Sequence, residues 1–344
     1  MMKKQHAKLI ALVMIVVALA LVPVWVKNGY YMDLLILITI NSILAMTFVM
    51  TYRAGMINVA VQVFWGIGAY ASALLVMKAG FSFWAAMPIA AIMAAVVSLA
   101  LSFLLLRNIG FQFIVLSMVI SMLFVVVLGN VEFFGRYAGI QSVPHPNPIR
   151  IPGLPVIEFN TKAQYFWLLL VLAVIVVLAF SALYNSSIGR AWRAIGLNSD
   201  LAATLGINVF RYRTIAFCIA NGTCGLLGAY FAHYQWYIMP DTFEMFKGLY
   251  ISMYAVLGGV ESSFLGPIIG TVIMIAFPEG MRIANEAEPI ITGILILFVV
   301  TLLPKGVVSI PYLRFFFADP LGTIGRFAGW IRKLLVKSDG GKEA

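Results

Sequence analysis

Residues 164–184 read QYFWLLLVLAVIVVLAFSALY, a run that contains no charged side chain. A helix needs about 20 consecutive apolar residues to cross the hydrocarbon core of a bilayer, and this run has that length. We therefore predict that residues 164–184 form a transmembrane helix. Similar runs precede and follow it along the chain, so this segment indicates the fold class of the whole protein.

The composition of the chain excludes a water-soluble fold. Of its 344 residues, 62% are hydrophobic and 10% are charged, and the mean hydropathy is +1.00. A soluble globular domain carries roughly 25% charged residues to cover its surface. This shortage of surface charge excludes a cytosolic enzyme, a disordered scaffold and a nucleic-acid binder. We read the net charge of +10 as a signal of membrane orientation, because Lys and Arg gather at the cytoplasmic ends of spanning helices.

Apolar runs between charged and turn residues predict an all-α polytopic membrane helix bundle with about ten transmembrane segments. The expected spans are 9–26, 31–50, 56–77, 83–106, 111–129, 164–184, 213–233, 245–259, 263–281 and 289–303. The first run is longer than the core of a cleaved signal, so we interpret it as a retained helix. Polar and glycine residues interrupt 56–77 and end 245–259, which leaves open whether these two segments are broken or re-entrant.

An even number of spans places both termini on one side of the membrane. If that side is the cytoplasm, most of the 23 Lys and Arg residues are cytoplasmic, as the positive-inside rule requires. Residues 1–310 then form one transmembrane domain, with a Pro-rich extracytoplasmic loop at 130–163 and a cytoplasmic loop at 185–213. Residues 311–344 form a basic tail, in which 322–337 is either an amphipathic interfacial helix or disordered.

The membrane interior lacks the groups that transport or catalysis inside the bilayer would use. No acidic or basic side chain falls near the middle of an expected span, and no Cys and His spacing matches a metal site. Cys218 and Cys224 lie about 9 Å apart along one expected helix, too far for a disulfide. The phosphate-binding pattern GxxxxGK[ST] is missing from the sequence. We therefore expect no enzymatic activity and an energy source outside the bilayer.

Uncharged polar residues do occur within the expected spans. They suit two roles: hydrogen bonding between packed helices, or a weakly polar lining for a translocated solute. The candidate residues for a solute pathway are Asn41, Asn58, Gln62, Gln112, Ser117, Asn221 and Thr223. Gly222, Gly225 and Gly228 lie three residues apart in the span 213–233, and we interpret this stripe as a surface for close helix packing.

The cytoplasmic loop 185–213 predicts two short helices. Residues 190–195 favour the first helix, and Gly196 is expected to close it. Ser199 is expected to cap the second helix, which Gly206 would end in a left-handed conformation. A helix of about six residues is unstable alone in water, so it needs a surface to dock on, either on its own bundle or on another protein.

Leu201 and Leu205 share one face of this second helix for such a contact, and Ala202 and Ala203 permit close approach. The alternative, from spacing alone, is an ordinary amphipathic loop. The candidate docking residues are Arg190, Arg193, Asp200, Leu201, Ala202, Ala203, Leu205 and Gly206.

Asp200-Leu201-Ala202 followed by Gly206 resembles the Glu-Ala-Ala-x-x-x-Gly coupling motif of ABC importer permeases, with Asp for Glu and Leu for the first Ala. Longer stretches are similar to the LivM-type permease subunits of branched-chain amino-acid importers. The matching stretches are 189–195, 205–212, 228–234, 240–243, 257–259, 265–270 and 303–306, with 65–70 nearer the N-terminus. The chain departs from the family pattern at 55–62, at 110–113 and at 196–197.

This resemblance implies a permease subunit in a bacterial inner membrane. Its implied partners are a homologous permease subunit, two cytoplasmic ATPase subunits that bind ATP-Mg, and an extracytoplasmic solute-binding protein. The chain itself would hold no cofactor and contact no nucleic acid. A permease for urea, an amide or a sugar fits the same residues, and a stand-alone channel or facilitator is the alternative from another class.

Overall fold

The computed structural model describes residues 20–23, 28–108, 110–148, 158–159, 161–260, 265–280, 293 and 297. Within these ranges the chain forms α-helices, short 3-10 turns and an isolated antiparallel bridge between Ile140 and Ile238. The all-α fold expected from the apolar runs is confirmed. The helices are α2 (Gly29–Arg53), α3 (Val61–Met77), α4 (Phe83–Leu105), α5 (Phe111–Asn130), α6 (Lys162–Asn185), α7 (Ser187–Leu197), α8 (Ser199–Thr204), α9 (Val209–Gln235), α10 (Met245–Gly258) and α11 (Leu265–Gly280), and the 3-10 turns are η1 (Glu132–Phe134), η2 (Arg136–Ala138) and η3 (Pro240–Phe243).

Helices α2, α4, α5, α6 and α9 are long and apolar enough to cross a membrane. The expected span 56–77 is helical only from Val61 onward, so α3 is shorter than predicted. Gly55 turns the chain with a φ of +77°, and the Asn58 carboxamide accepts a hydrogen bond from the backbone N–H of Ala60, which holds the preceding residues in a non-helical form. The expected spans 9–26 and 289–303 lie largely outside the described residues, and the tail 311–344 with its segment 322–337 lies wholly outside them. The count of ten spans and the side of both termini therefore stay predictions.

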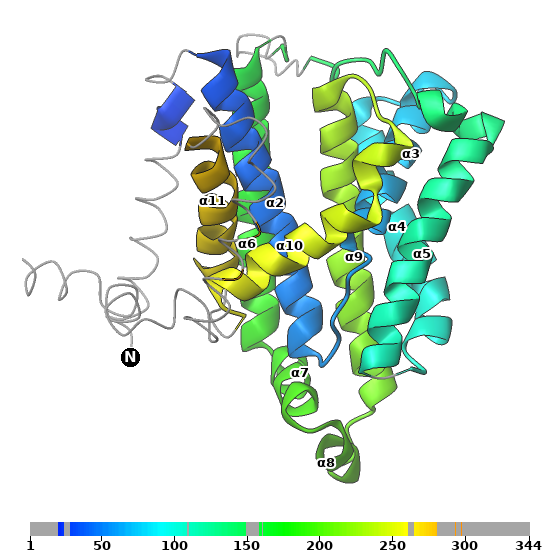
Figure 1. The fold of residues 1–344 in the computed structure, drawn as a ribbon, viewed down its shortest axis with the longest axis vertical. Coiled ribbons are helices and arrows are strands. Elements are labelled where there is room, and N and C mark those ends of the chain that lie inside the picture. The colour runs from blue at the N-terminus through cyan, green and yellow to red at the C-terminus, as the bar shows by residue number, and fades with distance from the viewer. Residues whose placement is uncertain are drawn as a thin grey trace, which may run out of the picture.

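Helix α9 lies at the centre of the bundle and packs most extensively against α3 and α4 (Figure 1). Glycine makes this close approach possible. A Cβ at Gly68 of α3 would lie 2.1 Å from the carbonyl oxygen of Gly225, and a Cβ at Gly225 would lie 2.5 Å from the Cβ of Ala94 on α4. Lipid supplies no hydrophobic drive between helices, so small residues that allow tight packing hold membrane bundles together. The glycine stripe of α9 is thus a packing surface, as expected.

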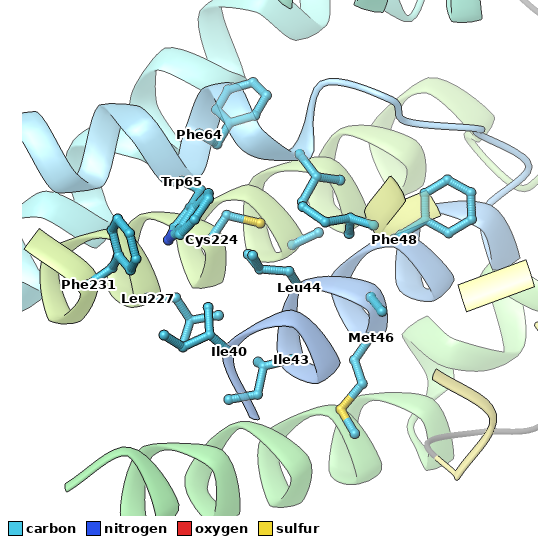
Figure 2. Close-up of a cluster of buried hydrophobic side chains, with 14 of the residues drawn as sticks. Ile40, Ile43, Leu44, Met46, Phe48, Phe64, Trp65, Cys224, Leu227 and Phe231 are labelled. Carbon is cyan, nitrogen blue, oxygen red and sulfur yellow. The ribbon is translucent and has the colours of Figure 1, made fainter. Parts of the chain in front are cut away.

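Helix α2 joins this central group to α6, α10 and α11. Figure 1 shows α2, α6 and α11 side by side, with α10 running obliquely across the bundle. Close to the middle of α2, apolar side chains of α2 face those of α3 and α9 (Figure 2). The labelled residues of this core are Ile40, Ile43, Leu44, Met46, Phe48, Phe64, Trp65, Cys224, Leu227 and Phe231.

The described part of the loop 130–163 contains the 3-10 turns η1 and η2, is otherwise irregular, and packs on the ends of the bundle helices. Ile140 pairs with Ile238, and the carbonyl oxygen of Pro144 lies 2.6 Å from Nδ1 of His233. The Asn147 side chain accepts a hydrogen bond from the backbone N–H of Phe83, at the start of α4. These contacts hold the loop in place although it contains no α-helix in its described part.

Candidate functional site

Two short helices, α7 and α8, project from the end of the bundle where α2 and α6 finish (Figure 1). Helix α8 begins where the Asn198 side chain accepts hydrogen bonds from the backbone N–H groups of Asp200 and Leu201, each at 3.0 Å. The prediction that Ser199 caps this helix is therefore wrong. The extended backbone of Asn198 places its carboxamide over the free N–H groups, and Ser199 is already the first helical residue.

Gly206 and Gly196 have different roles at the ends of these two helices. Gly206 has a φ of +83° and follows α8, and the N–H of Ile207 bonds back to the carbonyl of Ala202, as in a Schellman ending. Gly206 thus ends α8 as predicted. Gly196 does not close α7, which continues to Leu197. Gly196 serves packing instead, because a Cβ there would lie 2.5 Å from the carbonyl oxygen of Arg53.

Helix α8 exposes the apolar residues that a docking helix would offer. Leu201 is 60% exposed and Leu205 is 73% exposed, whereas Ala202 is buried at 2% against its own chain. Arg190, Arg193, Asp200, Ala203 and Gly206 are also exposed. The structure therefore brings the predicted docking residues together on one tip of the molecule, with Ala202 on the inner side.

Helix α7 is held firmly against the bundle. The buried Trp192 donates a hydrogen bond from Nε1 to the carbonyl oxygen of Tyr212, in the first turn of α9, at 2.8 Å. The Arg53 guanidinium lies 4.6 Å from the centre of the Tyr184 ring, which joins the ends of α2 and α6 beside α7. Trp192 was not among the predicted site residues, although a tryptophan in a polar loop indicates that the loop packs against the rest of the protein. Helix α7, which precedes α8, is thus fixed to α9 and lies beside the joined ends of α2 and α6.

The linker between α2 and α3 lies beside the same end of α9. Nε of Arg213 donates a hydrogen bond to the carbonyl oxygen of Ala54 at 3.1 Å. Three residues beyond Gly55 the linker reaches Asn58, which is completely buried. The linker thus connects the α7–α8 end of the bundle to its polar interior.

Four buried polar side chains form two hydrogen-bonded pairs, one between the linker and α9 and the other between α3 and α5. Nδ2 of Asn58 donates to Oδ1 of Asn221 at 3.3 Å, and Nε2 of Gln62 donates to Oγ of Ser121 at 2.8 Å. All four side chains are completely buried. Among the described residues, Oε1 of Gln62 and Nδ2 of Asn221 have no hydrogen-bond partner. This uncharged cluster, here called the amide cluster, retains one free acceptor and one free donor.

Other predicted pathway residues lie outside the amide cluster. Asn41 and Thr223 donate hydrogen bonds to carbonyl oxygens of their own helices, at Leu37 and Ile219. Gln112 is exposed at the start of α5. Ser117 is buried one turn before Ser121, and its hydroxyl bonds within α5. Of the seven predicted residues, Asn58 and Asn221 bond to each other, and Gln62 bonds to Ser121, which is outside the predicted set.

Comparison with known proteins agrees with this arrangement. Residues 30–300 match the family described as "Branched-chain amino acid transport system / permease component". The chain belongs to this permease family. It is 28% identical to the high-affinity branched-chain amino acid transport system permease protein LivM of Escherichia coli strain K12 over 322 residues, which are 88% of this chain and 75% of LivM. The resemblance to LivM-type permease subunits is confirmed.

Two further relatives are also named as permease proteins. The high-affinity branched-chain amino acid transport system permease protein LivH of Escherichia coli strain K12 is 26% identical over 157 residues, which are 45% of this chain and 49% of LivH. The guanosine ABC transporter permease protein NupQ of Bacillus subtilis strain 168 is 27% identical over 196 residues, 54% of this chain and 60% of NupQ. No solved structure matches the chain significantly. The family match and these relatives make the chain a permease subunit of the ABC transporter class, a membrane transport component.

Proposed function

We propose that this permease subunit imports branched-chain amino acids across the bacterial inner membrane, driven by ATPase subunits that dock on α8. The exposure of Leu201 and Leu205 on this six-residue helix carries the proposal. Such a short helix is unstable alone, and its apolar face needs a covering surface. A groove on a cytoplasmic ATPase supplies that surface.

The connections of α7 suggest how ATP hydrolysis drives transport. Closure of two ATPases that bind ATP-Mg moves α8, and the buried Trp192 passes this movement to the start of α9. The contact between Arg213 and Ala54 passes it on to the linker that carries Asn58. The amide cluster then opens or closes as the linker shifts relative to α9.

The amide cluster offers a weakly polar passage rather than a tight binding site. An uncharged set of amides and a hydroxyl binds a solute loosely, which allows the solute to leave. Specificity then comes mainly from an extracytoplasmic binding protein, which we expect to land on the loop 130–163. The similarity to both LivM and LivH supports pairing with a second, homologous permease subunit.

A nucleoside is the second candidate solute. The relative NupQ is named a guanosine permease, and the uncharged amide cluster suits the hydrogen-bonding groups of a nucleoside as well as those of an amino acid. Urea, amides and sugars fit the same chemistry. The choice among these solutes is made by measuring which of them the complex transports.

Reconstitution of the complete complex tests the proposal. Vesicles containing this chain with its permease partner and ATPases should accumulate leucine only when both ATP and the binding protein are present. Vesicles containing this chain alone should show no uptake. Accumulation or passive flux by the chain alone would establish a channel or facilitator, and ATP-driven uptake of guanosine but not leucine would reassign the solute.

A further inference from the structure

Arg213, near the start of α9, is a buried cation that has no carboxylate partner among the described residues. The residue is 6% exposed, and its hydrogen bond runs from Nε to the carbonyl oxygen of Ala54. In the part of the chain that the structure describes, no Asp or Glu lies within salt-bridge distance of it. Asp200 on the exposed helix α8 acts on the guanidinium only through space.

A buried guanidinium with so few partners is unfavourable in a resting protein. Taking a charge out of water is costly unless an opposite charge or several hydrogen bonds compensate for it. A guanidinium has five N–H donors in a planar fork that matches a carboxylate at two points. Its place at the start of α9 adds the positive end of the helix dipole. This position therefore favours the arrival of an anion.

The surroundings of Arg213 favour an anion that also carries an apolar group. Arg213 lines a cleft of about 70 Å³ together with Gly55, Met56, Ile57, Asn108 and Phe113. The wall of the cleft is therefore largely apolar, with one cation and one amide. A small molecule that combines a carboxylate with an aliphatic side chain complements this lining.

We propose that Arg213 binds the carboxylate of the transported amino acid at the α7–α8 end of the pathway, as the solute leaves the amide cluster. The inference rests on the proposed function, because it takes an amino acid as the solute. Ile57 of the cleft directly precedes Asn58 of the amide cluster, so the two sites adjoin along the linker. Arg213 and Asn221 are eight residues apart on α9, a rise of about 12 Å. The pathway thus runs from uncharged amides to a single cation.

Helix α5, which contributes Phe113 to the cleft, is the least buried of the described long helices, and we infer that it moves to widen the cleft. At about 70 Å³ the cleft is smaller than the roughly 300 Å³ or more of a ligand pocket, so an amino acid enters only after it widens. In the most apolar 18-residue stretch of α5, 22% of the residues are buried inside the protein, the smallest share among the described long helices. Within the described residues, its one side-chain hydrogen bond to another helix is the bond between Gln62 and Ser121. Breaking this bond at the amide cluster frees α5 and widens the cleft.

Binding of carboxylates by the intact complex, without the binding protein, tests this proposal. The probes are L-leucine, isovalerate, which keeps the carboxylate but lacks the amine, and L-leucinamide, which lacks the carboxylate. Each is added to the complex in nanodiscs, and saturation-transfer NMR measures its contact with the protein. For the wild-type complex we expect leucine and isovalerate to bind about tenfold more tightly than leucinamide, as a charge-assisted hydrogen-bonded pair provides.

Substitutions of Arg213 and of the nearby Arg211 test whether Arg213 itself binds the carboxylate. Arg213→Gln should lower leucine affinity about tenfold, and Arg213→Lys, which keeps the charge, should lose less. Arg211→Gln is the matched control, because Arg211 is exposed two residues away on the same helix. Its leucine affinity should equal that of the wild type.

Three results would overturn the proposal. The first is equal binding of leucinamide and leucine to the wild-type complex, a measurement that does not depend on the folding of any variant. The second is unchanged leucine binding by Arg213→Gln. The third is that Arg213→Gln loses its ATPase subunits but still binds carboxylates. The last result would make Arg213 a partner of an ATPase carboxylate instead. ATP-driven leucine uptake by the wild-type complex separates these failures from failure of the proposed function.

Discussion

Asn58 donates a hydrogen bond to Asn221 at 3.3 Å, across 163 residues of sequence, in a part of the bundle that water does not reach. Asn58 belongs to the non-helical linker between α2 and α3, and Asn221 belongs to the central helix α9. The linker also contacts Arg213 near the attachment of α7. This pair therefore connects the proposed solute pathway to α7 and α8, the helices on which we propose that ATPases dock.

Replacing both asparagines tests whether they serve transport or only packing. Asn58→Leu and Asn221→Leu should each destabilise the complex by about 1 kcal/mol, because each leaves a buried amide unpaired. The double variant should recover part of this stability, since both amides are gone, while the backbone N–H of Ala60 still lacks the acceptor that Asn58 supplied. We expect uptake to stay low in the double variant if the amides line the pathway. Thermal unfolding and leucine uptake check the two effects separately, and full recovery of uptake would reduce the pair to a packing contact.

Replacing Gly206 with valine should uncouple transport. The φ of Gly206 is +83°, and no atom lies within 4 Å of the position that a Cβ would occupy. Valine there brings backbone strain of about 1–2 kcal/mol without a clash, so its effect is confined to the end of α8. We expect solute-stimulated ATP hydrolysis and uptake to fall together in reconstituted vesicles.

Gly80, between α3 and α4, is the matched control for this prediction. Its φ is +69°, and a Cβ at this position would likewise have no atom within 4 Å of it. Gly80→Val therefore carries similar strain far from α8 and should leave coupling intact. Normal coupling in Gly206→Val would contradict a docking role for α8.

Charged substitutions on α8 should remove the ATPases without harming the fold. Leu201→Glu or Leu205→Glu places a carboxylate on a face that is exposed in the isolated subunit. Each should weaken ATPase binding roughly tenfold, the usual effect of losing an apolar anchor of 1–2 kcal/mol. Copurification of ATPase subunits measures the loss, with Leu201→Met as the control that keeps an apolar side chain. Undiminished copurification of both glutamate variants would place the dock elsewhere.

The packing of α3 on α9 should be sensitive to a single methyl group. Gly68→Ala would place a Cβ 2.1 Å from a backbone carbonyl oxygen, which cannot move aside as a side chain does. We expect a loss of about 3 kcal/mol, at the upper end of the usual overpacking cost. At Gly222, on the neighbouring face of α9, a Cβ would lie 3.3 Å from the Cβ of Ala95, so Gly222→Ala should be tolerated. Thermal unfolding of the purified complex measures the stability of the two variants, and equal stability would refute the close-packing interpretation.

Much of the fold was predictable because its causes are local in the sequence. The uncharged run 164–184 predicts a spanning helix from the cost of placing polar groups in hydrocarbon, and α6 occupies Lys162–Asn185. The left-handed ending at Gly206 follows from the conformational freedom of glycine, which needs no distant contact. The capping residue of α8 was mistaken by one position, because Asn198 and Ser199 both suit an N-cap.

The candidate site was not predictable in the same way, because it is formed by contacts between residues that are far apart in the sequence. Lipid solvates every apolar face of a helix equally well, so hydropathy does not specify how a helix is rotated about its axis. The fit of Gly68 against Gly225 sets that rotation for α3 and α9. It turns Asn221 toward Asn58, while Gln112 stays at an exposed position on α5. Membrane insertion and helix ends thus follow from composition and backbone preference, whereas the meeting of polar side chains follows from packing between distant helices.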